Sequence, residues 1–118
     1  MRRLAILAGL MFVTACGAPA PSPQQVAARA ATLLPTDARL ASLYAQSCQA
    51  CHARTDTGAP LTGDLAAWKP RVAKGLPALV QSAVSGVGGM PPGGQCFACT
   101  AADYEALIRF MSTGKDRE

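Results

Sequence analysis

Aromatic and histidine residues are scarce in this chain. Aromatics make up 5% of a sequence that is 50% hydrophobic, and His52 is its single histidine. A chain so poor in large side chains builds only a thin core by itself. The sequence also lacks any run of lysine and arginine interleaved with aromatic residues, so we expect no nucleic-acid partner. A site that needs two histidines from one chain is likewise excluded.

Long apolar runs are absent as well. The longest one, Leu4–Val13, is shorter than the roughly 20 residues that a membrane-spanning helix requires. Arg2 and Arg3 precede it and small residues follow it, which is the pattern of a secretory signal peptide. We therefore assign residues 1–15 to a signal peptide and expect export to the periplasm. A buried helix is the alternative for this run.

The end of this segment indicates a lipid anchor. Val13–Cys16 resembles the lipobox of bacterial lipoproteins, in which the cysteine is acylated and becomes the mature N-terminus. Cys16 is also the odd one among five cysteines, and acylation accounts for an unpaired cysteine in an exported protein. We predict a lipoprotein held at a membrane through Cys16, and Gly17 after it resembles the sorting signal for the outer membrane. Cleavage after Ala15 that leaves a free thiol is the alternative.

The next segment, residues 16–35, starts with the lipidated cysteine and is rich in alanine, proline, serine and glutamine. We interpret it as a tether, within which residues 26–34 fit a weak helix. A flexible chain of this size spans on the order of 25 Å root-mean-square, which is enough to hold a small domain clear of a membrane. Residues 36–118 remain as the folded domain.

This domain has helical patterns and no convincing strand, which predicts an all-α fold with long loops. The first helix begins near Thr36 or Asp37, either of which can cap it, and continues through Cys51. Asp64 can cap a second, short helix, which we expect to kink or end at Pro70.

Two more helices follow. Residues 76–85 form one, with a proline in its first turn and Gly86 at its exit. Thr100 and Asp103 make a capping box for the last helix. Its apolar stripe recurs at helical spacing and consists of Tyr104, Leu107, Ile108 and Met111.

The segment Cys48–His52, which reads Cys-Gln-Ala-Cys-His, carries the chemistry. Two thiols at this spacing can add across the two vinyl groups of one haem, and His52 beside them can donate a nitrogen to the iron. Such a motif is the attachment signal of c-type haem. A buried macrocycle would also supply the bulk that the thin core lacks.

The sixth iron ligand follows by elimination, since His52 is the only histidine. Of the methionines, two leave with the signal peptide, and Met111 lies on the apolar stripe of the last helix. Met90 stands in a glycine-rich loop directly before two prolines, where no packing period explains it. We predict Met90 as the ligand, with Lys69 and Lys74 as remote alternatives. Methionine ligation raises the haem potential relative to harder ligands.

The second Cys-x-x-Cys pair, Cys96 and Cys99, allows three interpretations. In an oxidising compartment the default is a disulfide between them. A catalytic dithiol is a second interpretation, although no βαβ pattern surrounds the pair. A zinc site that also uses Cys48 and Cys51 is the third, but the separation of the pairs far exceeds the usual spacing.

From about residue 43 to residue 112 the chain resembles cytochrome c5, a class I bacterial cytochrome c. The resemblance rests on the haem motif together with Gly58-Ala59-Pro60, Gly63-Asp64, Ala67-Trp68, Pro70-Arg71, Met90-Pro91-Pro92 and Cys96-x-x-Cys99. It implies the cytochrome c fold, with one covalent haem between crossed N- and C-terminal helices.

The same resemblance implies roles for single residues. His52 and Met90 become the axial ligands of the iron, and Cys96 and Cys99 a disulfide. Members of this family place the carbonyl of the residue matching Pro60 against the ligating imidazole, and the residues matching Trp68 and Arg71 near the haem propionates. Gly93 stands where family members often carry lysine, which removes a positive charge near the exposed haem edge.

The resulting prediction is an electron carrier rather than an enzyme. Its haem iron cycles between Fe(II) and Fe(III), and its partners are redox proteins such as a membrane oxidase, reductase or dehydrogenase. One alternative is the cytochrome subunit of a larger oxidoreductase. Another is a peroxidase in which Met90 dissociates, but no second histidine supports it.

Overall fold

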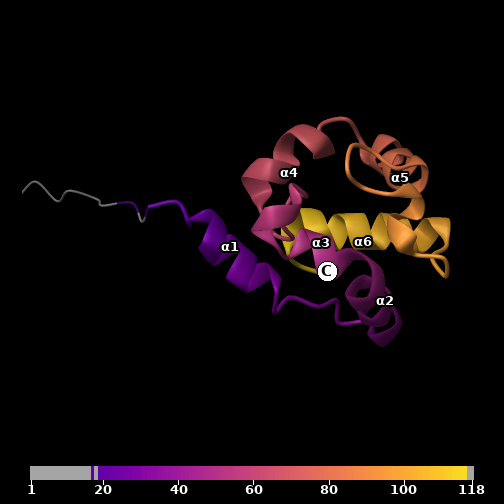
Figure 1. The fold of residues 1–118 in the computed structure, drawn as a ribbon, viewed down its shortest axis with the longest axis horizontal. Helices are drawn as coiled ribbons and strands as arrows, with labels where there is room; N and C mark the ends of the chain where they lie inside the picture. Colours follow the sequence, from indigo (N-terminus) through magenta and orange to yellow (C-terminus); the bar gives the residue numbers. More distant parts are fainter. Residues whose placement is uncertain (1–16, 18, 117–118) are drawn as a thin grey trace, which may run out of the picture.

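The computed structural model describes residue 17 and residues 19–116, so the predicted signal peptide and Cys16 lie outside the described residues. The described part is helical, and its one β-type contact is an isolated bridge between Val87 and Met90 (Figure 1). None of its helices is long and apolar enough to cross a membrane. The predicted all-α class is confirmed. The helices are α1 (Pro23–Ala30), α2 (Ala38–Leu43), α3 (Gln49–His52), α4 (Leu65–Val72), α5 (Leu76–Ser85) and α6 (Ala101–Thr113).

The first predicted helix is present but is not uniform. Asp37 caps it, its side chain accepting the Leu40 N–H at 2.8 Å. Between α2 and α3 the turn η1 (Tyr44–Cys48) is π-helical. A π-turn inserts one extra residue into the helix and therefore rotates the following face relative to the preceding one. The haem-motif residues sit directly after this turn.

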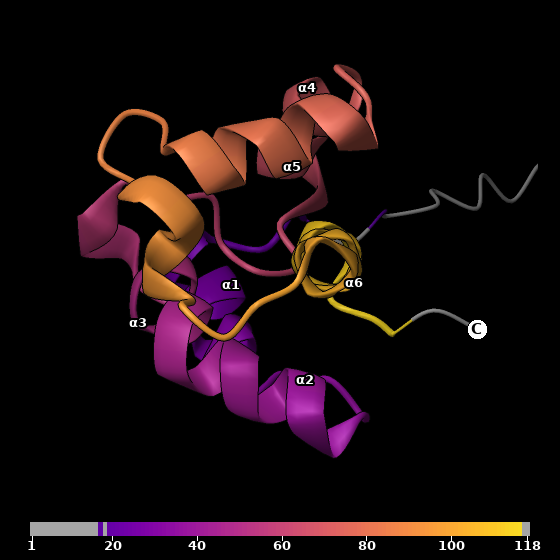
Figure 2. The ribbon, with the colours of Figure 1, turned by 90° about the vertical axis from the view of Figure 1, so that its right-hand side faces the viewer.

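The core forms where α6 crosses the other helices. Figure 2 shows α6 end-on, with α2 on one side and α4 and α5 on the other. The buried cluster consists of Tyr44, Trp68, Leu107, Phe110 and Met111. The rings of Tyr44 and Phe110 meet edge to face, with their centroids 5.2 Å apart, a geometry worth about 0.5–1.5 kcal/mol beyond the buried area. Met111 is a core residue, as its position on the helical stripe predicted.

The later helices begin and end close to the predicted positions. Helix α5 spans the predicted residues and is followed by Gly86, and the predicted capping box of α6 is present. Of the two outcomes expected at Pro70, a kink or an end, the helix does not end there, since α4 continues to Val72. Proline removes only one backbone donor there, and Asp64 caps the helix by accepting the Ala67 N–H at 3.0 Å.

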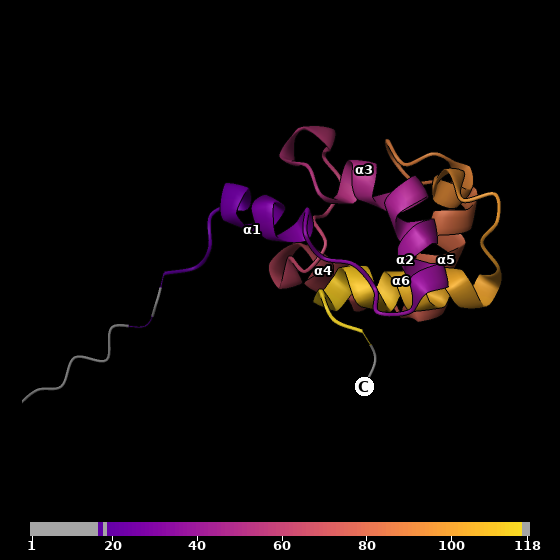
Figure 3. The ribbon, with the colours of Figure 1, turned by 90° about the horizontal axis from the view of Figure 1, so that it is seen from below.

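The segment predicted as a tether is partly folded. Its helix lies at α1, a few residues earlier than predicted, and extends from the domain in Figure 3. Ala30 is fully buried, and the Gln49 side chain donates to the Ala31 carbonyl at 3.1 Å. Leu33 packs against the core cluster. Ala30 and Leu33 therefore pack on the domain, because burial removes their apolar side chains from water, whereas Leu34 is half exposed.

An ion pair joins the starts of α2 and α6. The guanidinium of Arg39 donates to both carboxylate oxygens of Asp103, one of them at 3.0 Å. Asp103 is buried and also accepts from the backbone N–H and the hydroxyl of Thr100, at 2.7 and 2.8 Å. The hydrogen bond from Arg39, followed by those from Thr100, holds the pKa of Asp103 well below its usual range. The ionised carboxylate thus stabilises the fold.

We expect Asp103→Asn to destabilise the protein at pH 7 by on the order of 1–3 kcal/mol, because hydrogen bonds to a charged group are lost. A depressed folded-state pKa contributes stability above the unfolded-state value, about 3.9, and this contribution is lost as the pH falls further. The difference between variant and wild type should therefore narrow below about pH 4.

Urea unfolding of the haem-loaded proteins at a series of pH values measures this difference. Asp56→Asn is the control, since Asp56 pairs with Arg54 on the surface, where both side chains are more than half exposed. A loss in Asp56→Asn as large as that in Asp103→Asn would contradict the assignment.

Candidate functional site

The two thiols of the haem motif are the free cysteines among the described residues. Cys48 ends the π-turn η1 and is partly buried, whereas Cys51 lies in α3 and is exposed. Burial, and then the charge of Cys51, raise the pKa of Cys48 to about 11. Both thiols are thus unpaired, and their spacing of three residues along the chain is that of the c-type haem attachment motif.

His52 lies next to these thiols and is oriented by the loop that follows. Its ring is 7% exposed, and its Nδ1 lies 2.7 Å from the Pro60 carbonyl oxygen, the contact that the family resemblance implies. Burial lowers the pKa of His52, partly offset by this hydrogen bond, and the charge of Arg71 lowers it further. A neutral imidazole that donates through Nδ1 leaves its Nε2 lone pair free for a metal ion.

The loop itself is held by backbone contacts. The Thr62 N–H donates to the His52 carbonyl at 2.8 Å, and the hydroxyls of Tyr44 and Thr62 lie 2.9 Å apart in the interior. These contacts tie the loop to the helix that carries the haem motif, so the orientation of the imidazole does not depend on one hydrogen bond alone.

Trp68 and Arg71 lie on α4, on the same side of the molecule as His52. The Trp68 ring is buried, donates through Nε1 to the Leu61 carbonyl at 2.9 Å, and stacks on His52 with centroids 6.0 Å apart. Arg71 is partly buried and donates to the Ala67 carbonyl. It lines a cavity of about 230 Å³ together with Pro60 and residues of α1 and α4. The structure thus gathers both residues near the imidazole; their role toward propionates stays a prediction.

Met90 is presented by a loop whose backbone is closely packed. Val87 and Met90 exchange backbone hydrogen bonds at 2.9 and 3.1 Å. Gly86 has a φ of +81°, and a Cβ there would lie 2.9 Å from the Met90 oxygen and the Pro92 nitrogen. The Met90 methyl in turn lies against Gly94, where an added Cβ would be 3.0 Å away. The glycines allow the chain to close tightly around Met90.

The same loop is tied to the last helix and to the haem-motif helix. The Tyr104 hydroxyl donates to the carbonyl oxygens of Gly93 and Cys96, at 2.9 and 3.2 Å. The 3₁₀ turn η3 (Pro92–Gln95) packs against η1, which ends at Cys48. The sequence indicated Tyr104 only as part of an apolar stripe. Its hydroxyl role was missed, because a helical period predicts burial but not which carbonyls come within reach.

Cys96 and Cys99 form a disulfide with their Cα atoms 5.4 Å apart. The predicted zinc alternative does not fit, because two of its four sulfurs are bonded to each other. Among residues 17 and 19–116, no group of three or more His, Cys, Asp or Glu side chains is placed to hold a metal ion.

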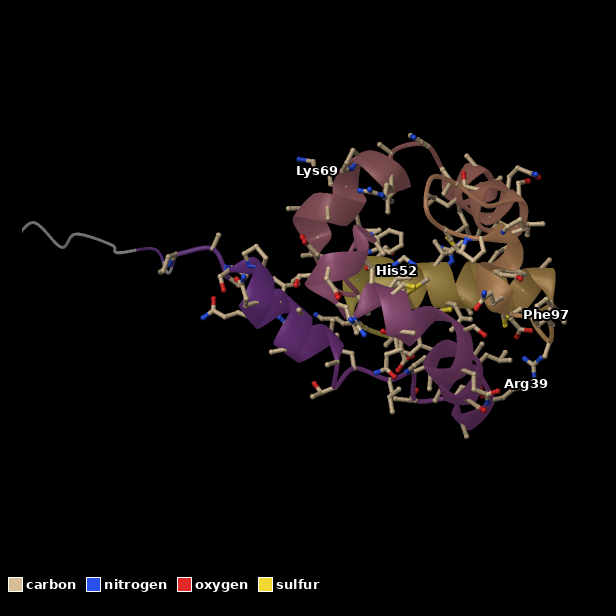
Figure 4. All side chains as sticks on the ribbon, viewed as in Figure 1. Arg39, His52, Lys69 and Phe97 are labelled. Atoms are coloured by element: carbon tan, nitrogen blue, oxygen red, sulfur yellow. A yellow bond between two sulfur atoms is a disulfide. The ribbon has the colours of Figure 1, made fainter. Side chains whose placement is uncertain are left out.

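These residues fit a covalently attached haem. Figure 4 shows His52 in the middle of the molecule, among the helices that carry the other site residues. The protein has two unpaired thiols three residues apart, a buried imidazole whose Nδ1 lies against the Pro60 carbonyl, and a thioether on a tightly packed loop. A macrocycle supplies four further nitrogen ligands, so two protein ligands complete an iron site.

Comparisons with known proteins agree with this chemistry. Residues 35–111 match the family model described as "Cytochrome C oxidase, cbb3-type, subunit III". The chain is 40% identical to cytochrome c5 of Ectopseudomonas mendocina over 72 residues, which covers 59% of this chain and 83% of the relative. It is 44% identical to cytochrome c5 of Azotobacter vinelandii over 72 residues, covering 59% and 87%. A cytochrome c-555 of Chlorobaculum tepidum is 38% identical over 72 residues, covering 58% and 67%.

A solved structure shares the fold. It was determined as an electron transfer complex of nitrite reductase with cytochrome c, and the matched chain is 37% identical to this one. The TM-score is 0.57, and the match covers 64% of this chain and 93% of the other.

The Gly86 geometry leads to a test of the loop. We expect Gly86→Ala to destabilise the haem-loaded protein by about 1–3 kcal/mol through backbone strain, with a further loss from the clash. Gly88→Ala is the matched control, because Gly88 also has a positive φ, +55°, but open space around it. Denaturant unfolding of both variants measures the difference in their free energies of unfolding. Equal losses of stability would show that the close packing of residue 86 against Met90 does not contribute to stability.

Proposed function

This chain belongs to the class I monohaem cytochromes c, and we propose that it is a one-electron carrier with His52 and Met90 as the axial ligands of its haem iron. One observation carries this proposal: two free thiols stand beside a buried imidazole whose Nδ1 is engaged by Pro60. The haem, when bound, supplies an iron that alternates between Fe(II) and Fe(III) and so takes up or gives up one electron.

The residues of the chain hold this group in four ways. Cys48 and Cys51 fix it covalently through thioether bonds. His52 donates Nε2 to the iron, and Pro60 restricts the rotation of the imidazole and raises its basicity. Met90 provides the sixth ligand from the loop that Tyr104 holds to α6.

Trp68 and Arg71 complete the surroundings. The Trp68 ring, buried against His52, excludes water from the imidazole. Arg71 lies close enough to influence the His52 ring, and its guanidinium suits pairing with a propionate.

Filled axial positions favour a carrier over an enzyme. Two protein ligands, His52 and Met90, would leave no open position on the iron for a substrate, so the bound group would supply electron transfer and no chemistry on a substrate. A second candidate function is the cytochrome subunit of a larger oxidoreductase. It is supported by the family model named for an oxidase subunit and by the structural relative crystallised with nitrite reductase. Both functions need a redox protein as partner.

The proposal includes export and a lipid anchor. The signal pattern at residues 1–15 directs the chain to the periplasm, where c-type haems are attached, and acylated Cys16 then holds it at a membrane, with the outer membrane as the proposed location. Between Cys16 and the domain, the chain includes helix α1, which would set the spacing from the membrane surface.

Replacing Met90 tests the ligand assignment. Met90→Ala should lose the weak red absorption band that sulfur ligation gives Fe(III). Its reduction potential should fall by on the order of 0.1 V, within the roughly 0.8 V range that axial ligands span. Met111→Leu is the control, since Met111 lies in the core and the change conserves volume. Visible spectroscopy and redox titration measure both properties. The reverse pattern, with the band lost only in Met111→Leu, would refute the assignment.

Replacing Cys16 tests the anchor. We expect mature wild-type protein to carry an acyl mass on Cys16 and to sediment with membranes. Cys16→Ser should be free of acyl groups and appear in the soluble periplasmic fraction, with its haem spectrum unchanged. Mass spectrometry and fractionation decide this, and a wild-type protein without acyl groups would contradict the anchor while leaving the electron-transfer function intact.

A further inference from the structure

The disulfide turn displays one aromatic side chain entirely to solvent. Phe97, between Cys96 and Cys99, is 98% exposed, the largest exposure among the exposed large hydrophobic residues of the described chain. Figure 4 shows it at one end of the molecule, well away from His52. Exposed single apolar residues are ordinary, but a fully exposed phenyl ring contributes nothing to the folding of the monomer.

The turn that carries Phe97 is rigid. Cys96 is buried and Cys99 packs against the core cluster, so both ends of the turn are fixed. The disulfide and a 3.1 Å hydrogen bond from the Cys99 N–H to the Cys96 carbonyl close it. The Tyr104 hydroxyl holds the Cys96 carbonyl from α6. An aromatic ring on a preorganised turn loses little conformational freedom on binding, which is the property of an interface anchor.

The segment of sequence that carries Phe97 is uncharged. Residues 75–102 contain no charged side chain, and this segment includes α5, the Met90 loop and the disulfide turn. It also exposes Val84 and Val87. Figures 1 and 2 both place α5 beside the start of α6. The nearest labelled charge, Arg39, lies at the same end, but it is paired with Asp103.

The turn is also connected to the haem-attachment site. Tyr104 holds both Cys96 and Gly93, and the turn η3 that contains Gly93 packs against η1, which ends at Cys48. The disulfide turn is thus tied through Tyr104 to the loop that carries Met90.

We infer that Phe97 is the anchor of a docking surface for a redox partner whose own surface is uncharged there and holds an apolar pocket for the phenyl ring. This rests on the proposed electron-transfer function and names the chemistry of its partner. Charge complementarity argues for it, because a charged partner surface would lose hydration against the segment between Lys74 and Asp103 without gaining a counter-charge.

Two other occupants fit less well. Anionic membrane surfaces are bound by segments rich in lysine and arginine, which this segment lacks. A symmetric dimer through Phe97 would bury about 150–250 Å² per ring, far below the roughly 1,200 Å² of a stable interface. Transient redox complexes lie at the small end of interface sizes, where one anchor residue has a large effect.

The test compares Phe97→Ala with wild type as full-length, haem-loaded, reduced proteins. The probe is the cell-envelope fraction of the host, membranes and periplasmic contents together, and the measurement is the second-order rate of haem oxidation. Leu65→Ala is the matched control, because Leu65 is 64% exposed on α4, outside the uncharged segment.

We expect the haem of Phe97→Ala to be oxidised at least about 10-fold more slowly than that of the wild type, which corresponds to a loss of about 1.4 kcal/mol of binding free energy. Leu65→Ala should stay within about 2-fold of wild type, a difference smaller than one hot-spot contact. The wild-type rate should change little with added salt.

Ferricyanide separates this inference from the function on which it rests. Equal oxidation of all three proteins by this small oxidant is expected, and a haem that ferricyanide cannot oxidise would count against electron transfer itself. The proposed docking surface is overturned if the envelope fraction oxidises Phe97→Ala and wild type at equal rates, or if it oxidises neither protein. It is also overturned if the oxidation rate of the wild type falls steeply as salt is added. A membrane or a second copy of the chain would be the occupant instead if Phe97→Ala is oxidised by the envelope fraction at the wild-type rate but loses binding to phosphatidylglycerol vesicles, or loses self-association in sedimentation. Either result overturns the proposal of a redox partner.

Discussion

The packing of Tyr44 between two helices and a loop is the contact on which the rest of the structure depends. Its side chain is fully buried; its ring lies edge-on to Phe110 of α6, and its hydroxyl lies against Thr62. Tyr44 also begins the π-turn that ends in Cys48. One residue thus joins the haem-motif helix, the C-terminal helix and the loop that orients His52. Because a chain with few aromatics has few such contacts to offer, the positions of these three segments are coupled to one another.

The site has two sides that are built differently. On the His52 side, hydrogen bonds from rigid elements set the imidazole: Pro60 engages Nδ1, and Trp68 stacks on the ring. On the Met90 side, no helix carries the proposed ligand, and the loop is closed by glycines that allow two backbone segments to approach each other. Tyr104 and the disulfide turn then fasten this loop to α6. A carrier needs both sides to stay in place as the iron changes charge, since reorganisation slows electron transfer.

Charge is distributed unevenly along the chain. Residues 75–102 carry no charged side chain, whereas the chain before and after them carries the arginines and lysines of the domain, among them Arg54, Lys69 and Arg109. The resemblance implies a lysine in many family members where this chain has Gly93. An uncharged segment with an exposed Phe97 fits the proposed partner surface, which would bind by apolar contact more than by long-range attraction that salt screens.

The haem motif, the bounds of α5, the capping box of α6 and the candidate ligand Met90 could be predicted from the sequence, because each depends on the identity and spacing of neighbouring residues. The run of α4 through Pro70, the π-turn after α2 and the packing of Ala30 and Leu33 on the domain could not, since they depend on surfaces that form only when distant segments meet. The same holds for the hydroxyl of Tyr104 and the exposure of Phe97. Sequence by itself determined the groups that we propose hold the cofactor, because covalent chemistry is local. The tertiary structure alone decided which side chains orient His52 and pack against Met90 and which aromatic ring is left exposed, because both depend on what the rest of the fold covers.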